Sequence, residues 1–481
     1  MSVQDLFVIL PTLVVVVWAL ALLLVDAWIP KERKSLTAWL SAAGLALALG
    51  LALAQRGLSP LMAFQDMVVR DGFAVFLEIV FLSSGLVAIA LAFDYLRRLR
   101  IEHGEYYPLL MISVAGMMLM AQANDLLIVF LALEMLSLPL YILTGIARPR
   151  LDSEESALKY FLLGTFSSAF LLYGVALIFG ATANTSLPGI VEAMAGVSAT
   201  VPLFVAGATL LLVGFAFKVA AVPFHMWSPD VYQGAPSPVT GFMSVGVKAA
   251  GLAALLRVFL VAFPSLAAQL SPLVAALAVL SMVVGNLLAM AQTNMKRLLA
   301  YAGVASAGYL LMAFVPYGQG KMAGESVSAM LFYLVAYALT SFGAWSVVVA
   351  LEQSEGRGLE IEDYAGLGFR YPWLAVPLVI FLLSYTGVPL TLGFWGKFYL
   401  FRVAVEGGYI GLALVGVLTS LFSAYYSLRV ILRLYAVGTP QVQGQRWLTL
   451  LAVLLAILVV GLSFLPGPLL QAMGQAVLAL P

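Results

Sequence analysis

The sequence predicts an all-α polytopic membrane protein with about 14 transmembrane helices. Two properties of the 481-residue chain predict this fold class: 63% of its residues are hydrophobic and only 10% are charged, and its mean hydropathy is +1.05. Soluble domains are far less apolar. Because one span needs about 20 apolar residues, the chain has room for many spans, short loops and no large domain outside the membrane.

The charge balance and the shortage of metal-binding side chains exclude other classes of protein. A net charge of +1 gives no basic surface for nucleic acid. The chain has 0 cysteines and 2 histidines, which removes disulfides and iron–sulfur clusters and leaves almost no way to hold haem or zinc. We therefore expect no cofactor on this chain, no nucleic-acid partner, and a lipid bilayer as its surroundings.

The individual spans follow from the positions of the apolar stretches. Residues 6–25 are too long for the core of a signal peptide, and no Lys or Arg precedes them, so we expect a retained helix there. The predicted spans, in order, are residues 6–25, 36–55, 73–93, 108–122, 125–146, 155–180, 202–222, 238–262, 272–293, 298–316, 326–351, 372–401, 409–436 and 447–467.

The distribution of Lys and Arg between the loops supports this number of spans. With both termini placed outside, fourteen of these residues fall in inside loops, four in outside loops and six within spans. Inside loops of membrane proteins carry the excess of Lys and Arg. We therefore expect a multi-pass protein with both termini on the outer side. A bacterial plasma membrane is the expected location, although the sequence carries no address signal for it.

Five charged residues lie inside predicted spans, where a charge is unfavourable. A charge in the middle of a bilayer costs about 2.5–3.5 kcal/mol even on the mildest scale, so such residues are paired, hydrated or functional. A buried lysine can release its proton, which an arginine cannot, so the lysines are suited to proton transfer. The five residues are Glu134, Lys159, Lys218, Lys248 and Lys397.

Proline and glycine residues stand close to three of these charges and predict interrupted helices. Proline frees the carbonyl four residues before it, which Pro139 and Pro223 would do at Met135 and Val219. Free carbonyls at membrane depth must be solvated by protein or water. Interrupted helices in two parts of a transporter indicate an inverted repeat around an ion site. The predicted helix breaks are Pro139, Pro223, Gly387 and Pro389.

A weak internal similarity agrees with two repeats. The segment SALKYFLLGTFSSAF, from Ser156, aligns with SAMLFYLVAYALTSF, from Ser328. In the same way VAAVPF, from Val219, aligns with YTGVPL, from Tyr385. Apolar helices align with one another easily, so these matches alone leave a repeat and chance equally open.

Longer motifs carry a resemblance to a known family. They are NDLLIVFLALEMLSLPLYIL, ALKYFLLGTFSSAFLLYG, FKVAAVPFHMWSPDVYQGAPSPVTGFMSVGVKAAG, QTNMKRLLAYAGVASAGY and GVPLTLGFWGKFYLF. Over nearly its full length the chain resembles the antiporter-like membrane subunits of respiratory complex I, the proton-translocating NADH-quinone oxidoreductase, and among them subunit N. Lys rather than Glu at position 397 argues against subunit M, and the lack of extra C-terminal helices and a long lateral helix argues against subunit L.

The resemblance implies an architecture and a set of partners. Helices 4–8 and 9–13 would form two inverted five-helix repeats, with helices 7 and 12 discontinuous. The neighbours would be subunits M and K and the lateral helix of subunit L, while FMN, iron–sulfur clusters and quinone would belong to partner subunits. The implied domains are an N-terminal three-helix segment (1–107), a first repeat (108–263), a second repeat (272–436) and a C-terminal helix (437–481).

The resemblance also assigns roles to the charged residues. Glu134 and Lys218 would form an ion pair in the first repeat. Lys248 would be the central relay, and Lys397 would lead to the exit on the outer side. The whole subunit would then couple quinone reduction elsewhere in the complex to proton transfer through this chain.

Other interpretations remain open for single residues and for the chain. Lys159 and His225 are possible relay residues, but Lys159 could instead reach the membrane surface and His225 could be a loop contact. Glu78 matches no part of the family's proton path, and we expect it to make a local hydrogen bond to a neighbouring helix. A subunit of a multi-subunit cation/proton antiporter is the alternative function, and a membrane scaffold is a third.

Overall fold

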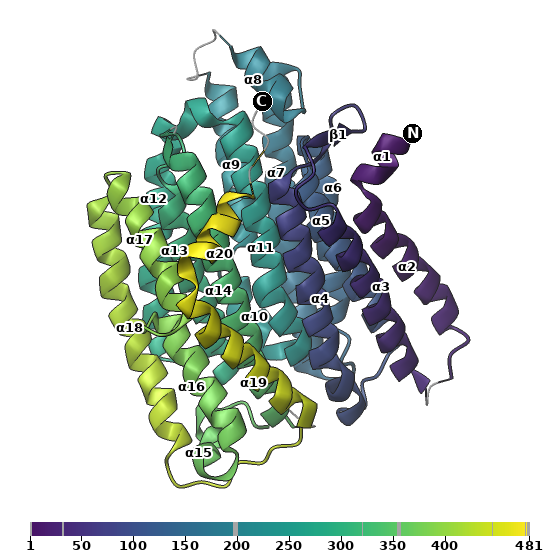
Figure 1. Cartoon of the computed structure of the whole chain (residues 1–481), viewed down its shortest axis with the longest axis vertical. Helices are drawn as coiled ribbons and strands as arrows, with labels where there is room; N and C mark the ends of the chain where they lie inside the picture. The colour runs from purple at the N-terminus through teal and green to yellow at the C-terminus, as the bar shows by residue number, and fades with distance from the viewer. Residues whose placement is uncertain are drawn as a thin grey trace.

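The computed structural model describes residues 2–30, 33–195, 201–319, 321–353, 357–444, 446–476 and 478. These residues form a bundle of helices with one small β-hairpin. Figure 1 shows most of the helices running side by side between the upper and lower ends of the molecule. The predicted all-α membrane fold is confirmed.

The N-terminal part contains three long helices and the hairpin. In the hairpin, Leu61 pairs with Arg70 in antiparallel register. Asp71, the N-cap of the helix that follows, forms a bidentate ion pair with Arg257 at 2.8 and 2.9 Å, which ties this part to the centre of the bundle. The elements are α1 (Val3–Val8), α2 (Leu10–Asp26), α3 (Ser35–Ala54), β1 (Leu61–Ala63), β2 (Val68–Arg70) and α4 (Gly72–Arg98).

The middle part of the chain corresponds to the first predicted repeat. Its elements are α5 (Tyr106–Gln122), α6 (Leu126–Thr144), α7 (Leu151–Thr182), α8 (Leu187–Met194), α9 (Pro202–Lys218), α10 (Trp227–Gly234), α11 (Ser237–Ala262) and the short turn η2 (Pro264–Leu266).

The remaining part contains the second predicted repeat and the C-terminal helices. Its elements are α12 (Ala267–Met290), α13 (Met295–Phe314), α14 (Lys321–Leu351), η4 (Ile361–Tyr364), α15 (Leu367–Arg370), α16 (Pro372–Thr386), α17 (Leu392–Glu406), α18 (Ile410–Leu434), α19 (Arg446–Gly461), η5 (Leu462–Phe464) and α20 (Pro466–Gly474).

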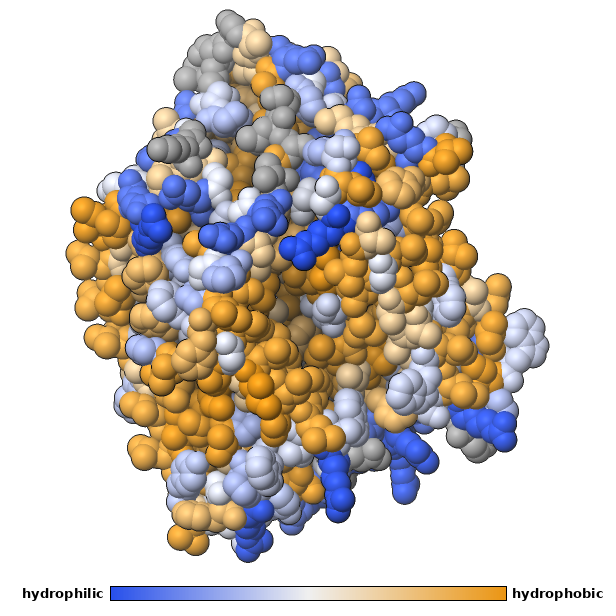
Figure 2. All heavy atoms as spheres, viewed as in Figure 1, coloured by the Kyte–Doolittle hydropathy of each residue, from blue (hydrophilic) through white to orange (hydrophobic). Residues whose placement is uncertain are grey.

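Helix length and surface character fit a membrane. In the described part of the chain, 10 helices are long and apolar enough to span a bilayer, and α2, α5, α9 and α16 are shorter apolar helices. Figure 2 shows hydrophobic side chains over the middle of this face and hydrophilic ones toward its two ends. Because a helix satisfies its own backbone groups, it is the form that lipid permits. The count of fourteen spans stays a prediction.

The two ends of the chain lie at the same end of the bundle. The hairpin contacts α1, and Met473 at the end of α20 and Ala476 just after it line a cavity together with Arg56 and Arg70. An even number of spans requires this arrangement. Which side of the membrane this end faces stays a prediction.

The centre of the bundle is α11, which packs against α4, α5, α9 and α14. Each of its residues from Ser237 to Ala262 is buried, so α11 has no side that faces lipid. Two of its residues, Lys248 and Arg257, are charged. Its neighbours must therefore supply polar partners, because lipid cannot.

Two predicted spans are interrupted as expected. Residues 219–226, which contain Pro223, separate α9 from α10, and residues 387–391, which contain Gly387 and Pro389, separate α16 from α17. The predicted break at Pro139 is wrong, because α6 runs through this residue without interruption. A single proline removes one helical N–H, and here the helix continues on both sides of it.

Candidate functional site

The interruption between α9 and α10 leaves a carbonyl without a helical partner, and a lysine from another helix binds it. α9 ends at Lys218, and the carbonyl oxygen of the next residue, Val219, accepts a hydrogen bond from Nζ of Lys248 at 3.1 Å. This is the carbonyl that the sequence predicts Pro223 to free. Ammonium and carbonyl groups stabilise each other here because bulk water cannot solvate either of them.

Lys218 donates to a hydroxyl group rather than to a carboxylate. Its Nζ lies 2.7 Å from Oγ of Ser137, which stands one turn after Glu134 on α6. Oε1 of Glu134 is buried and has no hydrogen-bond partner among the residues that the structure describes. The predicted direct ion pair between Glu134 and Lys218 is absent, because among the described residues Lys218 makes no ion pair within 4.0 Å. The physical reason is that Ser137 occupies the position in front of the ammonium group.

Lys248 lies where α11 meets α13 and α14. Gly303 of α13 leaves room at this point. A methyl group added to it would lie 3.2 Å from Cε of Lys248, 3.4 Å from its Nζ and 3.0 Å from the hydroxyl oxygen of Tyr337 on α14. The lysine of the first predicted repeat and the tyrosine of the second therefore converge on one small space.

The interruption between α16 and α17 has its own lysine. α16 ends with Gly387 in the left-handed conformation, at φ +87°. Nζ of Lys397, on α17, donates to the carbonyl oxygen of Thr386 at 3.0 Å and to Oγ of Ser420 on α18 at 3.2 Å. A glycine is suited to this turn because a Cβ in that conformation is strained. The free carbonyl of this break is thus also bound by a lysine.

Tyr309 of α13 completes the surroundings of Lys397. Nζ of Lys397 lies 4.3 Å from the centroid of the Tyr309 ring, within the range of a cation–π contact. The Tyr309 hydroxyl lies 3.2 Å from the hydroxyls of Thr419 and Ser420 and 3.4 Å from Nδ2 of Asn286. These groups form a polar network inside an otherwise apolar region.

All three lysines are buried without a carboxylate partner. Lys218, Lys248 and Lys397 are 1%, 3% and 3% exposed, and among the described residues none of them forms an ion pair within 4.0 Å. A permanently charged structural lysine at this depth would need a neutralising carboxylate to offset its burial. Hydroxyls and carbonyls allow these amines to gain or lose a proton instead.

Comparisons with known proteins assign the chain to a family. Residues 123–423 match the model described as NADH:quinone oxidoreductase/Mrp antiporter, TM. The chain belongs to this family. It is 45% identical to NADH-quinone oxidoreductase subunit N of Chloroflexus aggregans, over 99% of this chain and 98% of that protein. It is 44% identical to subunit N of Trichlorobacter lovleyi, over 98% and 97% of the two chains.

Chains of two solved membrane complexes share the fold. A chain of respiratory complex I from Thermus thermophilus with bound aureothin superimposes with a TM-score of 0.82 at 37% identity, covering 96% of this chain and 99% of that one. A chain of the Mrp complex from Dietzia gives a TM-score of 0.86 at 21% identity, over 99% and 97% of the two chains. The second similarity shows the fold alone.

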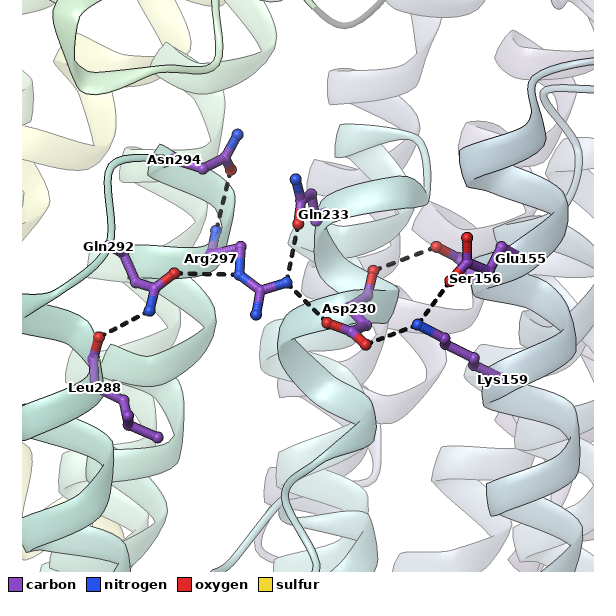
Figure 3. Close-up of polar contacts among 9 residues, drawn as sticks. All are labelled: Glu155, Ser156, Lys159, Asp230, Gln233, Leu288, Gln292, Asn294 and Arg297. Atoms are coloured by element: carbon purple, nitrogen blue, oxygen red, sulfur yellow. Dashed lines mark hydrogen bonds and ion pairs between the residues drawn. The ribbon is translucent and has the colours of Figure 1, made fainter.

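Lys159 belongs to a cluster of charges that sequence analysis missed. Figure 3 shows Lys159 of α7 and Arg297 of α13 on either side of Asp230, which lies on α10. Nζ of Lys159 and Nη1 of Arg297 each lie 2.8 Å from an Asp230 oxygen, and Lys159 also lies 2.7 Å from Glu155. The cluster holds α10, the second half of an interrupted span, between the two predicted repeats. A relay role for Lys159 stays a prediction.

The signal for Asp230 was present in the sequence but ambiguous. Asp230 lies in the motif FHMWSPDVYQGAPSPV, between two predicted spans, where a charged residue is ordinary. Arg297 donates to the side chains of Gln233 and Gln292 as well, at 2.9 and 3.1 Å. Only the folded structure shows that this motif, which resembles a loop in the sequence, contacts the start of α13.

His225 and Glu78 are the two remaining residues for which sequence analysis made a prediction. His225 lies in the first break. Its Nδ1 is buried and has no hydrogen-bond partner in the described part of the chain, and the centroid of its ring lies 6.3 Å from that of Tyr301. Its relay role stays a prediction. Glu78 makes the local hydrogen bond that we expected, because Nε2 of Gln122 on α5 donates to its Oε1 at 2.5 Å.

Proposed function

We propose that this chain is a proton-translocating subunit in the membrane part of an NADH-quinone oxidoreductase. One observation carries the proposal. The three buried lysines are bound to hydroxyls and to carbonyls freed at helix breaks, and no carboxylate of a described residue lies within 4.0 Å of their amines. Groups bound in this way can change protonation state without leaving an uncompensated partner charge.

In the first repeat, the proton would pass between two neighbouring lysines. Lys248 binds the carbonyl of the residue that follows Lys218, and two ammonium groups that approach each other at this break would repel each other. A proton that arrives on one lysine therefore favours the departure of the proton from the other. Movement of Lys218 between Ser137 and the free oxygen of Glu134 would change how firmly Lys218 holds its proton.

Transfer to the second repeat would use the space left by Gly303. There Lys248 and Tyr337 approach each other, and a hydroxyl group or a water molecule can carry a proton across such a gap. Lys397, held by Thr386 and Ser420, would then release the proton toward the outer side.

The electron-transfer chemistry would lie in partner subunits. We expect FMN, iron–sulfur clusters and quinone there, with subunits M and K and the lateral helix of subunit L as neighbours. The expected location is a bacterial plasma membrane with both termini on the outer side. The division into residues 1–107, 108–263, 272–436 and 437–481 is part of the same proposal.

The first test is gentle purification of the tagged chain from native membranes. Co-purification of NADH:quinone reductase activity is expected, whereas a redox-free complex that exchanges sodium for protons would overturn the proposal in favour of an antiporter. In the assembled complex, Lys218→Met is expected to lower proton pumping by about 100-fold or more. Lys218→Arg is the matched control for charge, and because arginine does not release its proton it should be equally defective.

A further inference from the structure

α11 and α14 pack in an antiparallel register that places polar side chains opposite each other. At the start of α11, Oγ of Ser237 donates to Oε2 of Glu352, the residue that follows α14. Further along, the hydroxyls of Ser244 and Ser341 lie 2.8 Å apart. Lys248 lies one turn beyond Ser244. Ser237, Ser244 and Lys248 therefore share one face of α11.

Glu352 is fully buried, and in the part of the chain that the structure describes its carboxylate is bound by two hydroxyl groups. The Tyr95 hydroxyl donates to its Oε1 at 2.9 Å, and Ser237 binds the other oxygen. Among the described residues Glu352 forms no ion pair within 4.0 Å. Arg98 and Lys296 donate to backbone carbonyls, and Arg98 also pairs with Asp94 at 3.9 Å. The ionisable side chains around it are Tyr95 and Arg98 of α4, Lys296 of α13 and Tyr364 of η4.

A polar cavity of about 650 Å³ opens beside Glu352. Leu351 and Gln353, the residues on either side of Glu352 in the sequence, both line it, so the backbone at Glu352 lies beside the cavity. Surface carboxylates exchange protons readily with water, and this end of the bundle is the one predicted to face the inside. The acidic residues that line the cavity are Glu360, Glu362 and Asp363.

Between Ser237 and Ser244, close side-chain packing closes the interface between α11 and α14. There Trp345 of α14 packs on Gly241 of α11, so closely that a methyl group on Gly241 would lie 3.2 Å from Cβ of Trp345. The two serines are about 10 Å apart along the helix, at about 1.5 Å per residue. A proton can pass from Ser237 to Ser244 only if water enters between them. Water can enter only if the Trp345 side chain moves.

We propose that the interface between α11 and α14 is the route by which protons reach Lys248, with Glu352 as the acceptor at its mouth and Trp345 as its closure. The proposal rests on the proposed function. The protonated carboxyl of Glu352 gives its proton to the chain of hydroxyls and water that starts at Ser237, and the neutral amine of Lys248 takes up a proton at the other end. The Glu352 carboxylate then takes a new proton from water in the cavity, and no electron moves.

The test compares Glu352→Gln with the wild type in the complete complex, reconstituted into vesicles and driven by NADH and quinone. Glutamine keeps the shape and the hydrogen bonds but cannot carry the proton. Pumping is expected to fall about ten-fold at neutral pH and to recover as the pH on the uptake side is lowered, because direct protonation from water then replaces Glu352. Glu406→Gln, at a half-exposed carboxylate at the end of α17, is the matched control and should pump normally.

The outcomes separate this proposal from the proposed function. If Lys218→Met in the same preparation pumps normally, the proposed function itself fails. If Lys218→Met is inactive and Glu352→Gln keeps the wild-type rate and pH profile, the uptake route alone is overturned. A loss that is equal at every pH shows that Glu352 only fixes the start of α11, which also overturns the route.

A second variant covers the case in which Glu352→Gln does not assemble. Ser244→Ala removes a hydroxyl from the middle of the route, away from the helix end that Glu352 holds. It is expected to give the same acid-dependent recovery of pumping, and a wild-type pH profile would overturn the proposal.

Discussion

The two helix breaks differ in where their free carbonyls find a donor. In the first, the carbonyl of Val219 is bound by Lys248, which comes from a different helix. In the second, the carbonyl of Thr386 is bound by Lys397, which belongs to the second half of the same interrupted span. A free carbonyl at membrane depth needs a hydrogen-bond donor. In the first break the donor comes from another helix, and in the second it comes from the same interrupted span.

This difference indicates that the two breaks have different roles in proton transfer. A donor from another helix makes the first break sensitive to the protonation of a distant part of the chain, because loss of that ammonium releases the carbonyl. A donor from the same span makes the second break more self-contained. We therefore expect the first break to control transfer and the second to affect mainly the last step.

The largest effect is expected for Lys248→Met, because this substitution removes both the relay amine and the donor to Val219. Pumping by the reconstituted complex should fall by about 100-fold or more. Lys248→Arg keeps a donor but cannot release its proton, so it should assemble and still not pump. Normal pumping by either variant would remove the first break from the mechanism.

Lys397→Met is expected to have a smaller effect, with pumping lower by about ten-fold, since uptake and transfer in the first repeat stay intact. The same vesicle assay measures it beside Lys248→Met. A loss larger than that of Lys248→Met would reverse the proposed ranking of the two breaks.

Gly303→Ala tests the connection between the breaks. The added methyl would lie 3.0 Å from the Tyr337 hydroxyl and 3.2 Å from Cε of Lys248, so one of them must shift, and pumping should fall about three-fold. Gly411→Ala is the control, because a methyl there meets nothing within 4 Å. Equal behaviour of the two variants would mean that protons do not use this space.

The smallest effects concern stability. Gly387 has φ +87° and Ala220 has φ +58°, so each break contains a left-handed residue, and the second also contains Leu390 at φ +72°. Gly387→Ala is expected to destabilise by about 1–2 kcal/mol, and Ala220→Gly to change stability by less than about 1 kcal/mol, since relief of strain is offset by chain entropy. Thermal unfolding of the purified complex measures both. A stabilising Gly387→Ala would contradict the described turn.

Local signals predicted much of this structure from the sequence. A lysine inside an apolar stretch, with Pro223 or Gly387 beside or before it, was enough to predict buried charges and two interrupted spans. The pairing could not be predicted in the same way. Glu134 and Ser137 share one face of α6, so periodicity cannot decide which of them meets Lys218. Pro139 failed as a signal because a proline that removes one bond need not end a helix.

Contacts between distant segments explain what sequence analysis missed. Asp230 and Glu352 both lie between predicted spans, in segments where acidic residues are ordinary. Their partners come from α4, α7, α11 and α13. Such sites depend on how helices far apart in the chain pack, and no local pattern carries that information.

The complete burial of α11 also bears on how the chain is made. Its two charged residues find partners that precede them in the sequence: Lys248 binds Val219, and Arg257 binds Asp71. Synthesis proceeds from the N-terminus, so both partners are already in the membrane when α11 emerges from the ribosome. The most costly helix to insert can therefore be neutralised before α13 and α14 exist to cover it.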